Sequence, residues 1–200
     1  MTGKLIAIEG CDGSGLSTQT KLLCEFLRSE GREVLQTKEP TESFVGKAVR
    51  SVLRKEVITD QKTLQLLFCA DRAHHLESEI MPALEKGKIV VTDRYIMSTL
   101  AFGSLDVDMG WLKKLNEKFP VPDLTIIIDV PEDVSIRRIK SSRPETELFE
   151  ETGKLKKIRE NYKALSEDFP NALTLDGTKT VEEVFRGVKS AVERTLNLNL

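Results

Sequence analysis

The chain has 200 residues, of which 40% are hydrophobic, and this size and composition suit one well-buried core. Charged residues make up 31% but nearly cancel to a net charge of -2, which argues against bulk binding to nucleic acid or to anionic membranes. No apolar run approaches the ~20 residues that span a bilayer, and Glu9 and Gly10 interrupt the run that begins at Leu5, so no signal peptide is expected. The three cysteines are widely spaced, as is typical of a reducing compartment. We therefore expect a single cytoplasmic domain over residues 1–200, with neither nucleic acid nor membrane as a partner.

Strand-like and helix-like segments alternate along the chain. In chain order, the expected elements are a strand over Leu5–Glu9, a helix over Ser17–Ser29, a strand over Glu33–Thr37, a helix over Phe44–Leu53, a long helix from Asp60 to about Glu85, strands over Ile89–Thr92 and Leu124–Val130, helices over about Glu132–Lys140 and Gly153–Asp168, a strand over Ala172–Leu175 and a helix over Val181–Leu196. Asp60 is expected to cap the long helix, and Pro82 to kink or break it. Five strands separated by helices predict an α/β fold, with a five-stranded parallel sheet covered on both faces and ligands bound beyond the carboxyl ends of its strands.

A glycine-rich segment joins the first strand to the first helix and matches the P-loop pattern G-x-x-x-x-G-K-[ST], except at the lysine. Its residues are Gly10, Cys11, Asp12, Gly13, Ser14, Gly15, Leu16, Ser17 and Thr18. The glycines allow a tight turn whose N–H groups point inward, and the start of the following helix favours an anion. Leu16 stands at the lysine position, and the loss of one such donor typically costs ~10²–10³ in rate. The alternative is a glycine turn before a helix, with no ligand.

Further motifs follow in a fixed order along most of the chain. They are Glu39-Pro40, Leu67-Phe68-x-Ala70-x-Arg72, Asp93-Arg94-Tyr95 with Ser98, Thr99 and Phe102 behind it, and Pro122-Asp123-Leu124. Together with the P-loop, this set resembles the thymidylate kinases, a family of P-loop nucleoside monophosphate kinases, although Lys38 stands where the family has an arginine. The resemblance implies a three-layer sandwich with a short lid, here at about residues 141–152.

The resemblance also implies a pocket for the phosphate acceptor. Phe68 and Arg72 are four residues apart and therefore share one helix face. In the family, this phenylalanine stacks on thymine and this arginine binds its O4 atom. Residues that would line the same pocket are Tyr95, Ser98, Thr99 and Phe102, the last packing under the sugar. Without the family context, the favoured reading of Phe68 is a core residue.

The phosphate chemistry is expected at the P-loop and the strand that ends on Asp93. Ser17 and Asp93 are the predicted ligands of Mg²⁺, with ATP as the co-substrate. By resemblance, Arg94 lies between the two phosphate groups, and Asp12 contacts the acceptor sugar or the metal shell. Kinases of the class that the chain resembles carry a catalytic arginine in the P-loop or in the lid. The P-loop has none here, so the resemblance implies a lid arginine, with Arg143 the first choice, ahead of Arg137 and Arg138. For Asp93 and Arg94 the alternative is a surface ion pair.

These patterns predict an enzyme that phosphorylates dTMP to dTDP with Mg-ATP, despite Leu16. One alternative is a catalytically impaired, nucleotide-binding regulator, and another is a deoxynucleoside monophosphate kinase of broader range. The family resemblance further implies a homodimer. His74 and His75 are adjacent, a spacing that does not suit a metal site on a helix, and both are expected to be ordinary polar surface residues.

Overall fold

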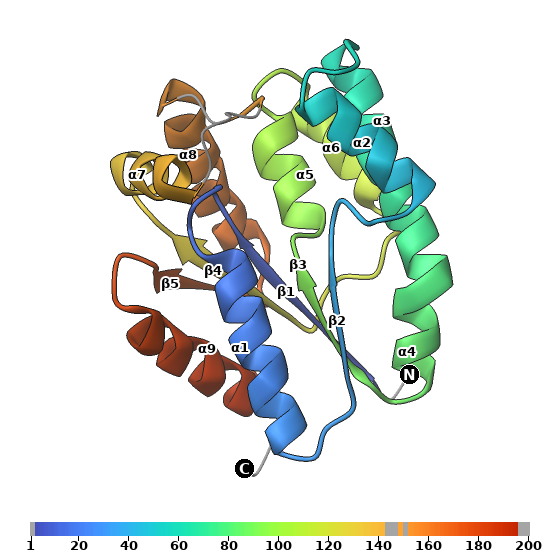
Figure 1. Ribbon diagram of the computed structural model, residues 1–200. Helices are drawn as coiled ribbons and strands as arrows, with labels where there is room; N and C mark the ends of the chain where they lie inside the picture. Colours follow the sequence, from blue (N-terminus) through green and yellow to red (C-terminus); the bar gives the residue numbers. More distant parts are fainter. Residues whose placement is uncertain (1–2, 143–147, 150–151, 196–200) are drawn as a thin grey trace.

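A five-stranded, fully parallel sheet forms the centre of the protein. The computed structural model describes residues 3–142, 148–149 and 152–195 (Figure 1). The strands are β1 (Lys4–Gly10), β2 (Val34–Lys38), β3 (Ile89–Asp93), β4 (Leu124–Asp129) and β5 (Ala172–Asp176), in the spatial order β2-β3-β1-β4-β5. The predicted fold class is confirmed, and the strand bounds differ from the predicted ones by one or two residues.

Both faces of the sheet are buried, because successive strand residues point to opposite sides and both sets are apolar. In β1, Leu5 and Ala7 enter one cluster of core side chains, whereas Ile6 and Ile8 enter the other. Helices α1 (Leu16–Ser29) and α9 (Val181–Thr195) cover the second face and contact each other (Figure 1). The remaining helices pack over the first face or around the carboxyl edge of the sheet.

The long predicted helix is a continuous helical path with a change of type in the middle. It consists of α3 (Gln61–His75), a π-helical turn η1 (Leu76–Ile80) and α4 (Met81–Glu85). Asp60 caps α3 by accepting a hydrogen bond of 2.8 Å from the Thr63 amide. Pro82 has no N–H and would crowd the carbonyl four residues earlier in an α-helix. The wider π turn lies immediately before this proline, so the path continues to Glu85 rather than ending there.

Two helices of the structure were not predicted, α5 (Ile96–Gly103) and α6 (Met109–Asn116). Seven of the eight residues of α5 are buried, so the segment has no polar face and no helical periodicity to detect. The other helices, α2 (Phe44–Leu53), α7 (Glu132–Ser142) and α8 (Thr152–Asp168), follow the predicted segments closely. Among the helices of the described residues, none has the length and apolar character needed to cross a membrane.

Candidate active site

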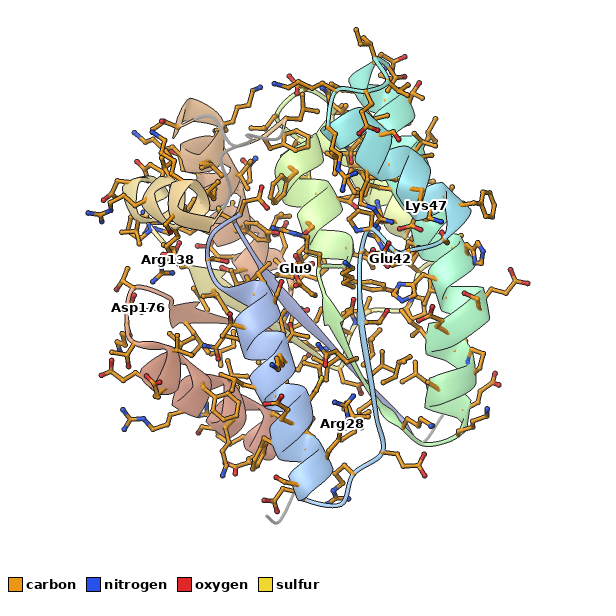
Figure 2. The ribbon with its side chains drawn as sticks, in the orientation of Figure 1. Glu9, Arg28, Glu42, Lys47, Arg138 and Asp176 are labelled. Atoms are coloured by element: carbon orange, nitrogen blue, oxygen red, sulfur yellow. The ribbon has the colours of Figure 1, made fainter. Side chains whose placement is uncertain are left out.

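The predicted site residues gather at the carboxyl edge of the sheet, where β1 and β3 end. Figure 2 shows Arg138 on the α7 side of this edge and Glu42 on the α2 side, with Glu9 between them. Two of the hollows that open there contain most of the predicted site residues. One is a cleft of about 580 Å³ along the P-loop. The other is a smaller cavity of about 120 Å³ between α3 and α5, which we call the acceptor cavity because the resemblance places the acceptor there.

The P-loop turns from β1 into α1 through glycines with positive φ, 76° at Gly13 and 95° at Gly15. Gly15 precedes the first turn of α1, whose free N–H groups face the cleft. Ser17 donates a hydrogen bond of 2.6 Å to Asp93, so the two predicted Mg²⁺ ligands lie together. Thr18 also lines the cleft, whereas the buried Ser14 hydroxyl lies outside its lining and has no partner among the described residues.

Leu16 packs away from the position that a phosphate-binding lysine would need to reach. Its side chain is only 6% exposed and belongs to the apolar cluster between the sheet, α1 and α9, although the residue borders the cleft. A Cβ atom on Gly10 would lie 3.4 Å from the Leu16 side chain. The loop therefore has an apolar, packed side chain where the P-loop pattern has a cation.

Among the described residues, four cations line the P-loop cleft: Lys38, Arg50, Arg94 and Arg138. Arg138 donates to the Gly13 carbonyl at 3.5 Å and to the Gly177 carbonyl at 3.0 Å, so its guanidinium lies against the P-loop backbone. Arg50 was missed by the sequence reasoning, because it lies in α2, outside every motif. Arg137, by contrast, pairs with Asp133 on the exposed side of α7. Arg143, the predicted catalytic arginine of the lid, lies outside the described residues.

Arg94 lies between the cleft and the acceptor cavity. Its backbone is left-handed, with φ 72°, a strained conformation for a residue other than glycine. The side chain donates to Asp12 at 2.7 Å, to the Gly10 carbonyl at 2.8 Å and to Ser98 at 3.1 Å. Burial is the largest single influence and opposes the charge, but Asp12, Tyr162, Asp93 and Glu9 together outweigh it and raise the pKa of Arg94. Arg94 is thus a fixed cation in contact with both hollows.

The acceptor cavity contains every residue that the family resemblance placed there. Its lining includes Phe68, Arg72, Tyr95, Ser98, Thr99 and Phe102. Phe68 also packs against the core, as the structural reading expected, while it lines the cavity as well. The Arg94 guanidinium lies 5.0 Å from the centre of the Phe102 ring. A fourth aromatic side chain of the lining, Phe149, packs edge-on against Phe102 with their ring centres 5.4 Å apart.

Arg72 is held by a buried polar network. Glu39 accepts from its Nε at 2.9 Å and from its Nη2 at 2.7 Å, while Asn116 accepts from Nη1. The expectation that His75 is a surface residue is wrong. This side chain is 2% exposed and contacts Glu39 at 3.2 Å and Thr37 at 2.7 Å. Adjacent helix positions point about 100° apart, so His75 faces the core while His74 remains partly exposed.

Glu9 joins the P-loop strand to α5 and α8. This fully buried carboxylate accepts from the amides of Tyr95 at 2.9 Å and Ser98 at 3.2 Å, from the Ser98 hydroxyl and from the Tyr162 hydroxyl at 3.0 Å. Burial raises the pKa of Glu9, and these hydrogen bonds offset only part of the effect. Sequence reasoning gave Glu9 no role, since its partners come from distant segments.

Comparison with known proteins identifies this arrangement. A family model described as "Thymidylate kinase" matches residues 8–188. The chain is 40% identical over 202 residues to "Probable thymidylate kinase" of Pyrococcus horikoshii, with 98% of each chain covered. It is 37% identical over 199 residues to "Thymidylate kinase" of Desulfotalea psychrophila, covering 98% of this chain and 97% of that one. The chain belongs to the thymidylate kinase family.

Membership of the thymidylate kinase family confirms the predicted resemblance and the predicted class of enzyme, a nucleoside monophosphate kinase. ATP-dependent phosphoryl transfer is the chemistry of this class. Thermosipho africanus provides a third relative, "Thymidylate kinase", which is 35% identical over 199 residues and matches 96% of this chain and 98% of its own.

Proposed function

We propose that this protein transfers the γ-phosphoryl group of ATP to dTMP, giving ADP and dTDP, in the cytoplasm. One observation carries the proposal: the P-loop cleft and the acceptor cavity share a wall. The residues that line both are Asp12, Glu39, Pro40, Leu53 and Arg94. A donor phosphate on the P-loop and an acceptor phosphate at the mouth of the cavity would therefore meet at Arg94. Phosphoryl transfer requires mainly such positioning and charge stabilisation.

Ser17 and Asp93 are the proposed protein ligands of Mg²⁺. Both present oxygen atoms, which this hard cation prefers, and the two side chains are in hydrogen-bond contact. Within the described part of the chain, no cluster of three or more acidic, histidine or cysteine side chains could hold a metal by itself. A site completed by phosphate oxygens and water is the usual arrangement for Mg²⁺ in phosphoryl transfer, and the bound ion would neutralise phosphate charge there.

Arg94 and the P-loop amides then do the work of orientation and charge stabilisation. The guanidinium is planar and already fixed by Asp12 and Gly10, so it needs little reorganisation to face a developing negative charge. We propose that Arg138, with Arg143 of the lid, provides the positive charge that Leu16 cannot. Arg138 is suited to this role because it already lies against Gly13 in the P-loop.

In the acceptor cavity, Phe68 is proposed to stack on the thymine ring and Arg72 to donate to its O4. Phe102 would pack under the deoxyribose. The cavity is small and its aromatic walls are fixed, which favours dTMP over a purine monophosphate. A broader deoxynucleoside monophosphate kinase remains the alternative that substrate comparison tests.

A homodimer is also proposed. Three large apolar side chains of α2, α3 and the segment between them face solvent: Phe44 is 77% exposed, Ile58 94% and Leu66 48%. Exposed apolar side chains grouped on neighbouring elements are typical of protein interfaces. Sedimentation velocity would show a dimer, and a monomer at every concentration would contradict it.

An assay of ADP release with Mg-ATP tests the catalytic proposal. The parent protein is compared with Leu16→Lys, using dTMP beside dUMP, dCMP, dAMP and dGMP. Turnover that depends on dTMP in the parent supports the proposed reaction, and similar rates with several monophosphates favour the broader enzyme. Activity in the variant alone would show that Leu16 disables a competent site. Nucleotide binding without turnover in either protein would favour the impaired regulator.

A further inference from the structure

Gln65 is a buried polar residue without a described role. It lies in α3, its side chain is 1% exposed, and it lines the acceptor cavity. Neither its Oε1 nor its Nε2 has a hydrogen-bond partner among the described residues. Leaving a buried donor and acceptor unpaired typically costs about 1–3 kcal/mol for each group, so such pairs rarely persist without a function or a bound molecule.

Gln65 is placed on the ligand side of its helix. It precedes Phe68 by three positions and Arg72 by seven, a spacing that puts all three on one face of α3. Opposite it stands Gly103 of α5, where a Cβ atom would lie 2.8 Å from the Gln65 Cδ and 2.9 Å from its Oε1. The absence of a side chain at Gly103 therefore makes room for the amide in the cavity wall.

The donors of Arg72 limit what this residue can recognise in a base. Arg72 has five N–H bonds. Its Nε–H is donated to Glu39, its two Nη2–H bonds to Glu39 and Thr99, and one Nη1–H to Asn116, so only one Nη1–H is left. A guanidinium offers no acceptor, and it can therefore recognise a carbonyl of a base but never an N–H.

We propose that the Gln65 side-chain amide reads the hydrogen-bonding edge of the acceptor base, directly or through one water molecule. The amide carries one acceptor and two donors, which match the N3–H and an adjacent carbonyl of thymine or uracil. Arg72 and Gln65 then divide the recognition, the first by donating to a carbonyl and the second by accepting from the N–H. This inference rests on the proposed function, and it makes Gln65 a specificity-determining residue.

The first test measures dTMP binding by calorimetry in the parent, in Gln65→Met and in Gln61→Met. Methionine keeps the length of the side chain but removes both polar groups, and Gln61 provides the same change one turn earlier, outside the cavity lining. We expect Gln65→Met to weaken dTMP binding about 5- to 100-fold, because the N–H of the base loses its partner. Gln61→Met should leave the affinity unchanged.

The melting temperature separates binding from a structural role. If Gln65 serves the ligand, Gln65→Met removes unpaired polar groups and leaves the ligand-free protein as stable as the parent or more so. A structural role would lower the melting temperature instead. Lower stability combined with unchanged dTMP affinity would overturn the inference.

A substrate analogue gives a second measurement, the first part of which uses the parent protein alone. The 3-deaza analogue of dTMP has C–H where thymine has N3–H. The parent should bind it more weakly than dTMP, and the difference should shrink in Gln65→Met, because paired changes to one interaction are not additive. Equal differences in the two proteins would overturn the inference while leaving the proposed reaction intact. A parent that binds no dTMP would overturn both.

Discussion

The acceptor cavity and the P-loop cleft differ in how their charges are held. In the cavity, Arg72 is 1% exposed and its charge is balanced by Glu39, which is itself 4% exposed. At the cleft, Lys38 pairs with Glu42 at 3.0 Å, but these side chains are 59% and 69% exposed. Removing one partner of a buried ion pair strongly destabilises the folded protein, whereas exposed ion pairs contribute little to its stability. We therefore expect the cavity to tolerate little change at its buried ion pair, and the cleft, which several described cations line, to tolerate the loss of one cation.

The largest effect is expected where the two regions meet. Arg94→Ala should lower kcat/KM by about 10³-fold, mostly through kcat. An arginine that stabilises the transferred phosphoryl group accelerates kinases and related enzymes by about this factor. Steady-state ADP release measures it. Arg186→Ala, on the exposed side of α9, is the matched control and should be neutral. An Arg94→Ala protein within tenfold of the parent, with its fold intact, would remove Arg94 from the phosphate chemistry.

The contrast between buried and exposed pairs can be tested on neighbouring carboxylates. Glu39→Gln leaves the buried guanidinium of Arg72 without its counter-charge and should lower the free energy of unfolding by about 3–5 kcal/mol. Glu42→Gln removes only exposed pairs with Lys38 and Arg50, and should cost less than about 1 kcal/mol. Urea unfolding measures both. Similar losses would show that the two regions do not differ as inferred.

Leu16→Lys tests how far the cleft compensates for the missing lysine. We expect kcat to rise about tenfold. This is less than the ~10²–10³-fold effect typical of one hydrogen-bond donor to the transition state, because Arg138 is proposed to supply part of the positive charge already. The same change should reduce the free energy of unfolding by about 2 kcal/mol, since a buried leucine leaves its apolar cluster. Leu16→Met should change neither property much, as it conserves side-chain volume.

A double-mutant cycle identifies the compensating residue. Arg138→Ala should lower kcat strongly in the parent and less in the Leu16→Lys background, where the new lysine takes over part of the role. Equal effects in both backgrounds would exclude Arg138 as the substitute and leave Arg143 of the lid to be tested in the same way.

Sequence reasoning was most successful where the information is local. The P-loop, the strand ends and the positions of Phe68 and Arg72 on one helix face follow from spacing within single elements. The same reasoning missed α5, since a helix buried on all sides has no periodic pattern. It also failed for His75, where neighbouring positions gave no sign of the core carboxylate that the ring contacts.

Two of the residues missed at the site depend on distant partners. Glu9 contacts α5 and α8, and Gln65 faces a glycine of α5. Arg138, which was named from the sequence, likewise contacts the P-loop from α7. These sequence separations range from 38 to 153 residues, so only the packing of the fold brings the groups together. A motif can name a chemical group, but its charge balance is a property of the tertiary structure.

The smallest predicted effect concerns Glu9, the carboxyl group buried between the two regions. Its pKa is raised in the folded protein, so above the ordinary value of 4.5 the unfolded chain ionises while the folded one still holds its proton. Rising pH therefore removes stability from the parent until the folded pKa is passed. Glu9→Gln does not titrate, and its stability relative to the parent should rise with pH over this window, by at most about 1.4 kcal/mol per pH unit.

Urea unfolding of both proteins across this pH range gives the difference directly. Glu183→Gln serves as a matched control of opposite sign, because hydrogen bonds from the Thr180 amide and hydroxyl lower the pKa of Glu183. That carboxylate stabilises the parent as pH rises toward 4.5, so the stability of this variant relative to the parent should fall over that range. A pH-independent difference for Glu9→Gln would mean that Glu9 is ionised in the folded protein throughout. Its four hydrogen bonds and the nearby Arg94 would then outweigh burial, and the junction of the two regions would hold a permanent negative charge beside the cation that serves both.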